Sequence, residues 1–205
     1  ISVGPGGTQA DDDSSNPPMS ADGRWVAFYS FATNLVVGDS NGFGDVFVHD
    51  RQTATTTRVS VGPGSTQANG TSYEAAISAD GRWVVFLSLA NNLVGGDSNG
   101  FDDAFVHDRQ TGATTLVSVG VAGAPGNGDA YAPAISAAGR CVAFGSLASN
   151  LVVGDTNGTE DVFVRDLQTG TTTRVSVGPG GVQGNSFSLD PAISADGRSV
   201  AFRSL

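Results

Sequence analysis

Lysine is absent from this sequence, and all ten of its basic residues are arginines, set against twenty acidic residues. The net charge of −10 excludes the basic surface that nucleic-acid-binding proteins need, and it disfavours anionic membrane surfaces. The longest apolar runs are far too short to span a bilayer. The single cysteine, Cys141, excludes an internal disulfide bond. We therefore expect no nucleic-acid partner and no membrane insertion.

Groups that commonly carry out catalysis are also scarce. The two histidines, His49 and His107, occupy equivalent positions of an internal repeat, and Arg165 stands at the third such position. Two imidazoles with no evident third ligand make a poor metal site. The sequence also has no P-loop and no dinucleotide-binding fingerprint. These absences predict a protein without catalytic activity.

The internal repeat is the strongest feature that the sequence does contain. An eleven-residue segment beginning Ser-Ala recurs four times at a spacing of 58 residues, and residues 19–61 match residues 77–119 at 32 of 43 positions without a gap. The copies are Ser20–Ser30, Ser78–Ser88, Ser136–Ser146 and Ser194–Ser204. Such a period lies just above the range typical of solenoids, propellers and arrays. We divide residues 1–205, as a single repeat domain, into complete units 19–76, 77–134 and 135–192, preceded by the tail 1–18 and followed by the head 193–205.

The second unit illustrates the expected secondary structure. Ala75–Ser78 is a short apolar run, and Trp83–Leu87 after an Asp-Gly turn is rich in β-branched and aromatic residues. Two further strands are expected at Asp103–Asp108 and Thr114–Val119, the last followed by a Gly-rich connector. Four antiparallel strands and a connector, repeated, are typical of a β-propeller blade. A β-sandwich would not repeat so strictly, and a solenoid would use shorter coils. The sequence predicts an all-β propeller with about three and a half blades.

Several motifs of the first unit resemble a known family. They are Ser20–Phe28, Asn34–Val36, Gly38–Gly42 and Asp45–Arg51, which together resemble the TolB-like, WD-repeat-like propeller family of bacterial secreted and periplasmic proteins. The resemblance covers essentially the whole chain. It implies that the four strands of each blade run from the channel outward in chain order. It also implies a role as a protein-interaction platform, a surface protein or an accessory domain of an enzyme.

The number of blades is small for a closed ring. Propellers have about four to eight blades, and this chain supplies about three and a half. Three explanations stay open: a longer parent protein was cut, blades of another chain complete the ring, or a four-bladed ring closes with a defective blade. We expect a fragment or repeat unit of something larger.

An acidic loop precedes the third expected strand of each unit. In the first unit, Asp39, Asn41 and Asp45 place side-chain oxygens at the first, third and seventh positions around a glycine. Calcium takes about six to eight oxygen ligands, which these side chains, a backbone carbonyl and waters would supply. The spacing departs from that of an EF-hand, and the alternative is a plain Asx turn. The candidate metal ligands, with calcium as the expected cofactor, are Asp39, Asn41, Asp45, Asp97, Asn99, Asp103, Asp155, Asn157 and Asp161.

The Asp-Gly-Arg turns offer a second candidate site. Asp80 and Arg82 of the second unit, with Asp108 at a strand end, would bind an anion or form a structural pair, and repetition in every blade favours the structural pair. Ala138 replaces the acid in the third copy, so that turn is expected to be held less tightly.

The segments that differ between copies are expected to gather on one rim near the channel. They are Gln9–Pro18, Gln67–Ala75, Gly123–Pro133 and Gln183–Pro191. Their side chains are acidic and partly aromatic, and loops on a rigid scaffold commonly carry recognition. The alternative is drift in unconstrained loops.

Taken together, the sequence predicts a non-catalytic, extracytoplasmic propeller module that is a structural or protein-interaction scaffold, stabilised by calcium. Its expected partner is another protein or another copy of itself. A glycan-binding propeller is one alternative, and an accessory domain of a secreted hydrolase is another.

Overall fold

A computed structural model describes residues 2–205, and its regular structure is β-strands with four short 3-10 turns. The first blade contains β1 (Ser14–Ser15), β2 (Trp25–Ser30), β3 (Asp45–Asp50) and β4 (Thr55–Arg58). The second contains β5 (Ser72–Ile77), β6 (Trp83–Ser88), β7 (Asp103–Asp108) and β8 (Ala113–Leu116). The third contains β9 (Ala130–Ile135), β10 (Cys141–Ser146), β11 (Asp161–Asp166) and β12 (Thr171–Arg174). The last sheet contains β13 (Ser188–Ile193) and β14 (Val200–Ser204). The 3-10 turns are η1 (Pro5–Gly7), η2 (Pro63–Ser65), η3 (Val121–Gly123) and η4 (Pro179–Gly181).

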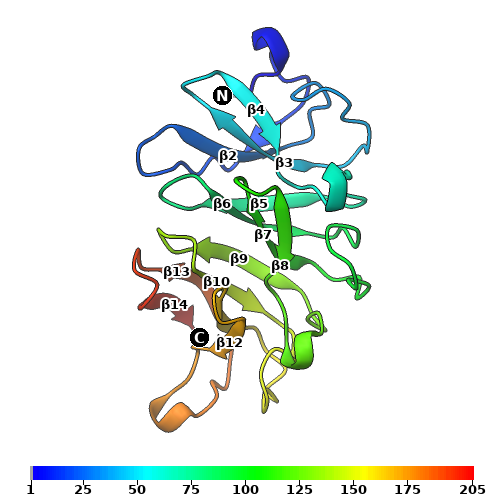
Figure 1. The fold of residues 1–205 in the computed structure, drawn as a ribbon. Helices are drawn as coiled ribbons and strands as arrows, with labels where there is room; N and C mark the ends of the chain where they lie inside the picture. Colours follow the sequence, from blue (N-terminus) through cyan, green and yellow to red (C-terminus); the bar gives the residue numbers. More distant parts are fainter. Residues whose placement is uncertain (1) are drawn as a thin grey trace.

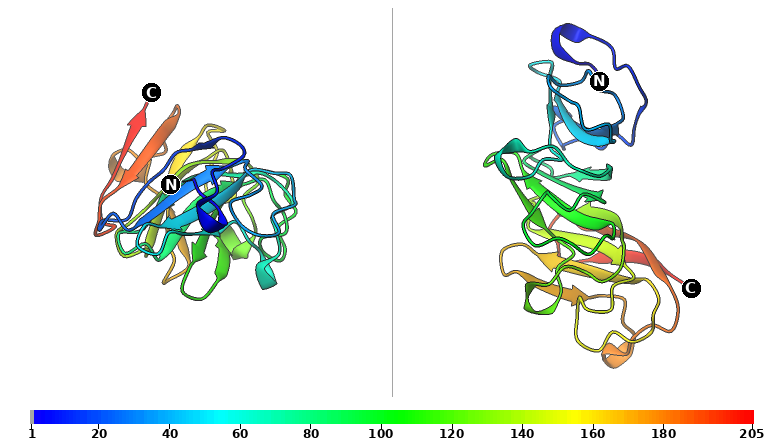
Figure 2. Two further views of the ribbon diagram at one scale, coloured as in Figure 1. Left: turned by 90° about the horizontal axis from the view of Figure 1, so that it is seen from above. Right: turned by 90° about the vertical axis from the view of Figure 1, so that its right-hand side faces the viewer.

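Each sheet is antiparallel, and its strands lie side by side in chain order. The sheets stack face to face in a fan, with the N-terminal and C-terminal sheets at its two ends (Figures 1 and 2). The first strands of successive sheets, β5, β9 and β13, contact one another along the inner edge of the fan. This arrangement confirms the predicted propeller blades and their strand order.

The second and third strands are buried because each blade is covered by its neighbours. All six residues of β3 and of β7 are buried. A phenylalanine pair stacks across these two strands in every complete blade, as in Phe86 and Phe105, whose ring centroids lie 6.0 Å apart. The equivalent pairs are Phe28 with Phe47 and Phe144 with Phe163.

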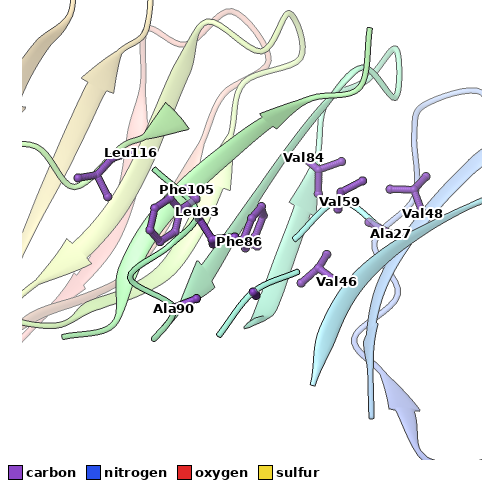
Figure 3. Packing of buried hydrophobic residues seen from close by; sticks show 11 residues of the cluster. Ala27, Val46, Val48, Val59, Val84, Phe86, Ala90, Leu93, Phe105 and Leu116 are labelled. Carbon is purple, nitrogen blue, oxygen red and sulfur yellow. The ribbon is translucent and has the colours of Figure 1, made fainter. Parts of the chain in front are cut away.

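The hydrophobic core lies between blades as well as within them. Val46 and Val48 of the first blade belong to the same buried cluster as Val84 and Phe86 of the second (Figure 3). A second cluster joins the second blade to the third in the same way. Because burial of apolar area is the main stabilising contribution to folding, each complete blade depends on its neighbours.

Backbone hydrogen bonds also connect successive blades. The amide of Ala21 donates to the carbonyl of Ala79, Ala79 donates to Ala137, and Ala137 donates to Ala195, at 2.9–3.0 Å. In each case the turn before a second strand binds the equivalent turn of the next sheet. The 58-residue period therefore appears in the structure as a ladder from sheet to sheet.

The inner strands carry a bulge that the sequence pattern did not predict. Glu74, Ala132 and Asp190 lie 58 residues apart and have positive φ angles of 47°, 44° and 53°, and the strand register shifts beside each of them. Non-glycine residues adopt this conformation at a cost of about 1–3 kcal/mol, and such positions gather at functional sites. Because the bulge recurs at the same position of successive sheets, it belongs to the architecture of the blades and fixes the backbone along their inner edge.

The predicted strand boundaries were correct in the middle of each blade and less so at its edges. The first strand of the second blade begins at Ser72 rather than Ala75, and the fourth ends at Leu116 rather than Val119. Beyond Leu116 the chain leaves the regular ladder, since the amides of Val117 and Ser118 both point to the carbonyl of Ala104. Among residues 2–205, no helix is long and apolar enough to cross a membrane.

Candidate functional site

The first acidic loop is organised by an arginine from the fourth strand. Nη1 of Arg58 lies 2.9 Å from Oδ1 of Asp39 and 3.1 Å from Oδ2 of Asp45, so that one guanidinium nitrogen bridges both carboxylates. The side-chain amide of Gln67 also joins the loop, accepting from Arg58 at 3.1 Å and donating to the carbonyl of Gly38 at 2.9 Å. The positive charge of Arg58 therefore compensates the negative charges of Asp39 and Asp45.

The third acidic loop repeats this arrangement. Nη1 of Arg174 lies 3.3 Å from Oδ1 of Asp155 and 3.4 Å from Oδ2 of Asp161. Nε2 of Gln183 donates to Oδ1 of Asp155 at 2.8 Å. Both carboxylates are nearly fully buried, which makes the nearby positive charge important to their stability.

The second acidic loop lacks both compensating residues. Leu116 stands where the other blades have arginine, and Pro125 stands where they have glutamine. Asp97 is 8% exposed and Asp103 is fully buried. Oδ1 of Asp97 is buried and receives no hydrogen bond from the described part of the chain. Burial raises the pKa of Asp97, and burial raises the pKa of Asp103 to about 6, with the Asp97 charge adding to the increase.

The remaining contacts of the three loops are alike. In the second loop, Ser118 Oγ donates to Asp103 Oδ1 at 2.5 Å and accepts from the amide of Ala104 at 3.1 Å. Nδ2 of Asn99 donates to Oδ2 of Asp103 at 2.7 Å, and its oxygen accepts from the amide of Phe101 at 3.1 Å. The asparagines therefore act as turn residues that fix the second aspartate of each loop, as the Asx-turn alternative proposes.

The nine predicted calcium ligands thus gather as three separate clusters, one in each blade. Within residues 2–205, no cluster brings together three or more His, Cys, Asp or Glu side chains in a geometry that could hold a metal ion. Each loop instead combines two carboxylates with an asparagine. Calcium binding by the nine residues stays a prediction.

The Asp-Gly-Arg turns hold structural pairs in each complete blade. Arg82 makes two hydrogen bonds to the carboxylate of Asp108, at 2.8 and 2.7 Å, and lowers the pKa of that group well below its usual range. Asp80 accepts from Ser78 Oγ at 2.6 Å and from the amide of Arg82 at 3.0 Å. Since the charges are paired and repeated, we assign them to the framework of the fold.

These turns also contact the neighbouring blade. The indole ring of Trp25 packs against Gly81 of the next turn so closely that a Cβ atom there would collide with it. The guanidinium carbons of Arg24 and Arg109 lie 4.4 and 3.8 Å from the ring centroid of Trp25. Cys141, at the position of this tryptophan in the third blade, is a free, half-buried thiol whose Sγ lies 3.0 Å from where a Cβ of Gly197 would be.

The two histidines are likewise part of the framework. Nδ1 of His107 lies 3.0 Å from Oγ1 of Thr114, which donates its own proton to the carbonyl of Val61 in the preceding blade. Arg165 takes the histidine's place in the third blade and donates to the equivalent Thr172 at 3.0 Å. Each of these side chains is therefore a hydrogen-bond donor in a link between blades.

A cluster of unlike polar residues lies at the inner rim between the second and third blades. Tyr73 of β5 and Tyr131 of β9 stand near Asp102 and Asp129, and the amide of Asp102 donates to Asp129 Oδ1 at 3.0 Å. Burial, followed by the hydrogen bond to Asp102, raises the pKa of Tyr73. Glu160 takes the place of Asp102 one blade further on, between the third blade and the last sheet, where its carbonyl accepts from the amide of Ser188. It is 9% exposed, and burial followed by the charge of Asp190 raises its pKa to about 7.

The acidic rim expected from the variable segments thus combines the buried Glu160 and the half-buried Asp102 and Asp129 with the exposed Glu74 and Asp190. Glu74, on the bulge of β5, accepts a hydrogen bond of 3.3 Å from the amide of Ala132 on the bulge of β9. Asp102 and Glu160 were not singled out from the sequence, because each lies in a loop position that carries a different residue in every blade. The glycine at position 145, which leaves room for the Glu160 carboxylate, is the signal that could have found it.

Two segments match the residue spacing of a catalytic motif but do not have the local structure that the motif requires. Gly38–Gly42 and Gly96–Gly100 have the Gly-x-Ser-x-Gly spacing of serine hydrolases. That motif requires a sharp strand-to-helix turn that exposes the serine. Here the segments lie in loops that lead into strands β3 and β7, and their neighbouring aspartates are engaged as described above.

Comparison with solved structures identifies the fold. The chain superposes on TolB from Acinetobacter baumannii (TM-score 0.55, 18% identity, covering 95% of this chain and 38% of that one). It is similar to a putative TolB from Agrobacterium tumefaciens (TM-score 0.57, 17% identity, 96% and 55%). It is also similar to an oligogalacturonate lyase in complex with manganese (TM-score 0.59, 14% identity, 95% and 48%).

The class of structure follows from these matches and from the blades described above. The chain has a TolB-like β-propeller repeat fold, as the sequence motifs predicted. No protein-family model matches it, and no curated protein sequence does. The chain spans about half the length of the propellers that it matches, or less. Because some of these propellers belong to enzymes, similarity at this level of identity defines the fold and leaves the activity to be proposed.

Proposed function

We propose that this chain is a non-catalytic, extracytoplasmic propeller module that binds another protein at its inner rim. The observation that carries the proposal is the contrast between the repeated and the unrepeated polar groups. Repeated groups, such as Arg82 with Asp108 and His107 with Thr114, are paired in the framework of the blades. The unrepeated polar and aromatic groups are concentrated at the inner rim.

The chemistry of the rim favours a polar protein segment as the ligand. Glu74 on β5 and Asp190 on β13 are exposed on the two inner strands that contact β9 from either side, and Phe187, directly before β13, is 43% exposed. Carboxylates and an aromatic ring on a rigid support suit a segment with basic and apolar side chains. The bulges hold Glu74 and Asp190 in the left-handed region, so their positions are fixed by the backbone rather than by flexible loops.

Site-specific photo-crosslinking tests this proposal. A photo-reactive phenylalanine analogue replaces Phe187 at the rim or, as a matched control, Val37 in the loop before β3, which is 90% exposed. Each variant is irradiated with the extracytoplasmic fraction of the cells that produce the protein. A discrete adduct from position 187 that weakens when Glu74→Gln and Asp190→Asn are added supports the proposal. Absence of an adduct at 187, or equal adducts at both positions, would contradict it.

Glycan binding is a second candidate, favoured by a groove that recurs between blades. A cavity of about 310 Å³ lies between the first and second blades, and one of about 380 Å³ lies at the equivalent place between the second and third. Equivalent residues line the two cavities, including Gly62, Pro63 and Thr114 in one and Gly120, Val121 and Thr172 in the other. A glycan array distinguishes the two functions, since a lectin of this kind would lose binding on Thr114→Val with Thr172→Val and keep it on Glu74→Gln.

A further inference from the structure

The three acidic loops have the same arrangement of carboxylates, but only two of them contain a positively charged side chain. Arg58 and Arg174 each place a guanidinium nitrogen between two buried carboxylates, whereas Leu116 leaves the second loop without that charge. We propose that the second loop binds a calcium ion at this position, between Oδ1 of Asp97 and Oδ2 of Asp103. The arginines of the first and third loops then act as built-in substitutes for the ion.

The buried charge of the second loop is the first argument. Oδ1 of Asp97 is the counterpart of the atom that accepts from Arg58 in the first loop, and it has no donor within residues 2–205. Two carboxylates this deeply buried are strongly destabilised unless a positive charge compensates them. Leu116 and Pro125 supply none, so whenever both carboxyl groups are ionised the compensating positive charge comes from outside the chain.

The second argument is that the remaining parts of the site are already in place. Asp103 keeps the same hydrogen bonds from Ser118 and Asn99 that its counterparts receive in the other loops. The carbonyl of Gly38 is engaged by Gln67 in the first loop, while Pro125 has no side-chain donor for the equivalent carbonyl of Gly96. The substitutions thus remove a cation and an amide donor and leave oxygen atoms behind.

The donor set favours calcium over other ions. It consists of carboxylate and carbonyl oxygens, without histidine or cysteine, which selects a hard cation. Calcium tolerates irregular coordination completed by waters, whereas magnesium demands a near-ideal octahedron and gives up its waters reluctantly. Two carboxylates predict modest affinity, in the range of about 0.1–1 mM that is typical of extracellular modules.

Thermal unfolding of the whole chain tests the site. The Tm of the wild type is measured first in chelator and then in 5 mM CaCl2. It is expected to be about 3–5 °C higher in calcium, because the ion binds only the folded state. Leu116→Arg copies the first and third loops into the second. It is expected to melt above the wild type in chelator and to lose the calcium-dependent gain. MgCl2 at the same concentration, with ionic strength matched by NaCl, is expected to have little effect.

Matched variants of the other loops complete the test. Arg58→Leu with Gln67→Pro copies the second loop into the first and is expected to acquire a second calcium-dependent gain. Asp97→Asn is expected to remove the gain of the wild type and keeps the test valid if Leu116→Arg does not fold. A wild-type Tm that ignores calcium would overturn the proposal. An equal gain in Leu116→Arg or Asp97→Asn, or an equal effect of magnesium, would overturn it as well.

Discussion

Single residues that differ between otherwise equivalent blades are the most informative in this molecule. Arg58, Leu116 and Arg174 stand at one position of the repeat, and the change at Leu116 alters the charge of a buried site while the asparagine and serine contacts of its second aspartate are kept. His107 and Arg165 differ in chemical type, yet both donate to a threonine. Comparison of equivalent positions thus separates residues that hold the fold from residues that are free to change.

Gly81 is a residue whose substitution should report on packing between blades. Its φ of +73° and its contact with Trp25 both disfavour a side chain. Gly81→Ala is expected to lower the free energy of unfolding by about 3 kcal/mol, the sum of conformational strain and overpacking. Gly112→Ala is the matched control, since Gly112 has a φ of +75° and open space around it, and it should cost only about 1 kcal/mol. Equal losses in urea denaturation would contradict close packing at Trp25.

His107 should make stability depend on pH. Burial lowers its pKa to about 4, and the neighbouring Asp108 and Arg109 have opposing smaller effects. Because the folded pKa lies below the unfolded value of about 6.5, its contribution is complete above pH 6.5 and is lost as pH falls toward 4. Between pH 7 and 4.5, the wild type should lose about 2 kcal/mol relative to His107→Gln, which keeps an N–H donor.

Denaturation in urea at pH 7, 6 and 4.5 measures this difference. The control is His49→Gln, which removes the equivalent histidine of the first blade, whose pKa burial also lowers. Parallel pH profiles for the wild type and His107→Gln would show that His107 is free to take up a proton in the folded protein and would contradict the account.

At the scale of the element, the turn before each second strand is the unit that repeats most faithfully. Its serine caps the following strand, as Ser78 Oγ accepts from the amide of Trp83 at 2.9 Å and donates to Asp80. In the third blade Ser136 keeps the first contact, to Cys141 at 3.0 Å. Ala138 cannot provide the second, which agrees with the looser turn expected from the sequence.

Ala138→Asp should therefore stabilise the protein. It restores an acceptor for the Ser136 hydroxyl and for the amide of Arg140, with an expected gain of about 0.5–1 kcal/mol in the free energy of unfolding. Asp80→Ala in the second blade is the mirror experiment and should cost at least as much. A destabilised Ala138→Asp variant in urea denaturation would contradict the role assigned to this carboxylate.

Strands and repeats could be predicted from the sequence because their signals are local. Trp83–Leu87 and Asp103–Asp108 are recognisable from composition alone, and Asp-Gly marks the turn between the first two strands. The bulges at Glu74, Ala132 and Asp190 could not be predicted, because they depend on pairing with the second strand. The same limit applies to the acidic loops, where Arg58 reaches Asp39 across 19 positions of the chain.

At the scale of the molecule, stability should vary along the fan of blades. The second blade is covered on both faces, and all of β7 is buried, whereas residues 201–204 of β14 are exposed. In this 205-residue chain, hydrogen exchange measured by mass spectrometry should therefore be slowest in β6 and β7 and fastest in β13 and β14. Equal protection of β7 and β14 would contradict this gradient.

The inner rim and the acidic loops belong to different parts of this architecture. The rim gathers residues that differ from blade to blade, including Glu74, Asp102 and Glu160, and we propose it as the place of recognition. The acidic loops repeat, and in them a guanidinium or a calcium ion compensates the same pair of carboxylates. Failure of one proposal therefore leaves the other standing.

The number of calcium ions bound by each chain tests the account most directly. Isothermal titration calorimetry of the wild type, after removal of metal with a chelator, is expected to give one ion per chain, because only the second loop lacks an arginine. Three ions per chain would mean that Arg58 and Arg174 do not take the place of the ion, and binding of none would mean that the Asp97 and Asp103 pair is compensated in another way. Either result would contradict the account.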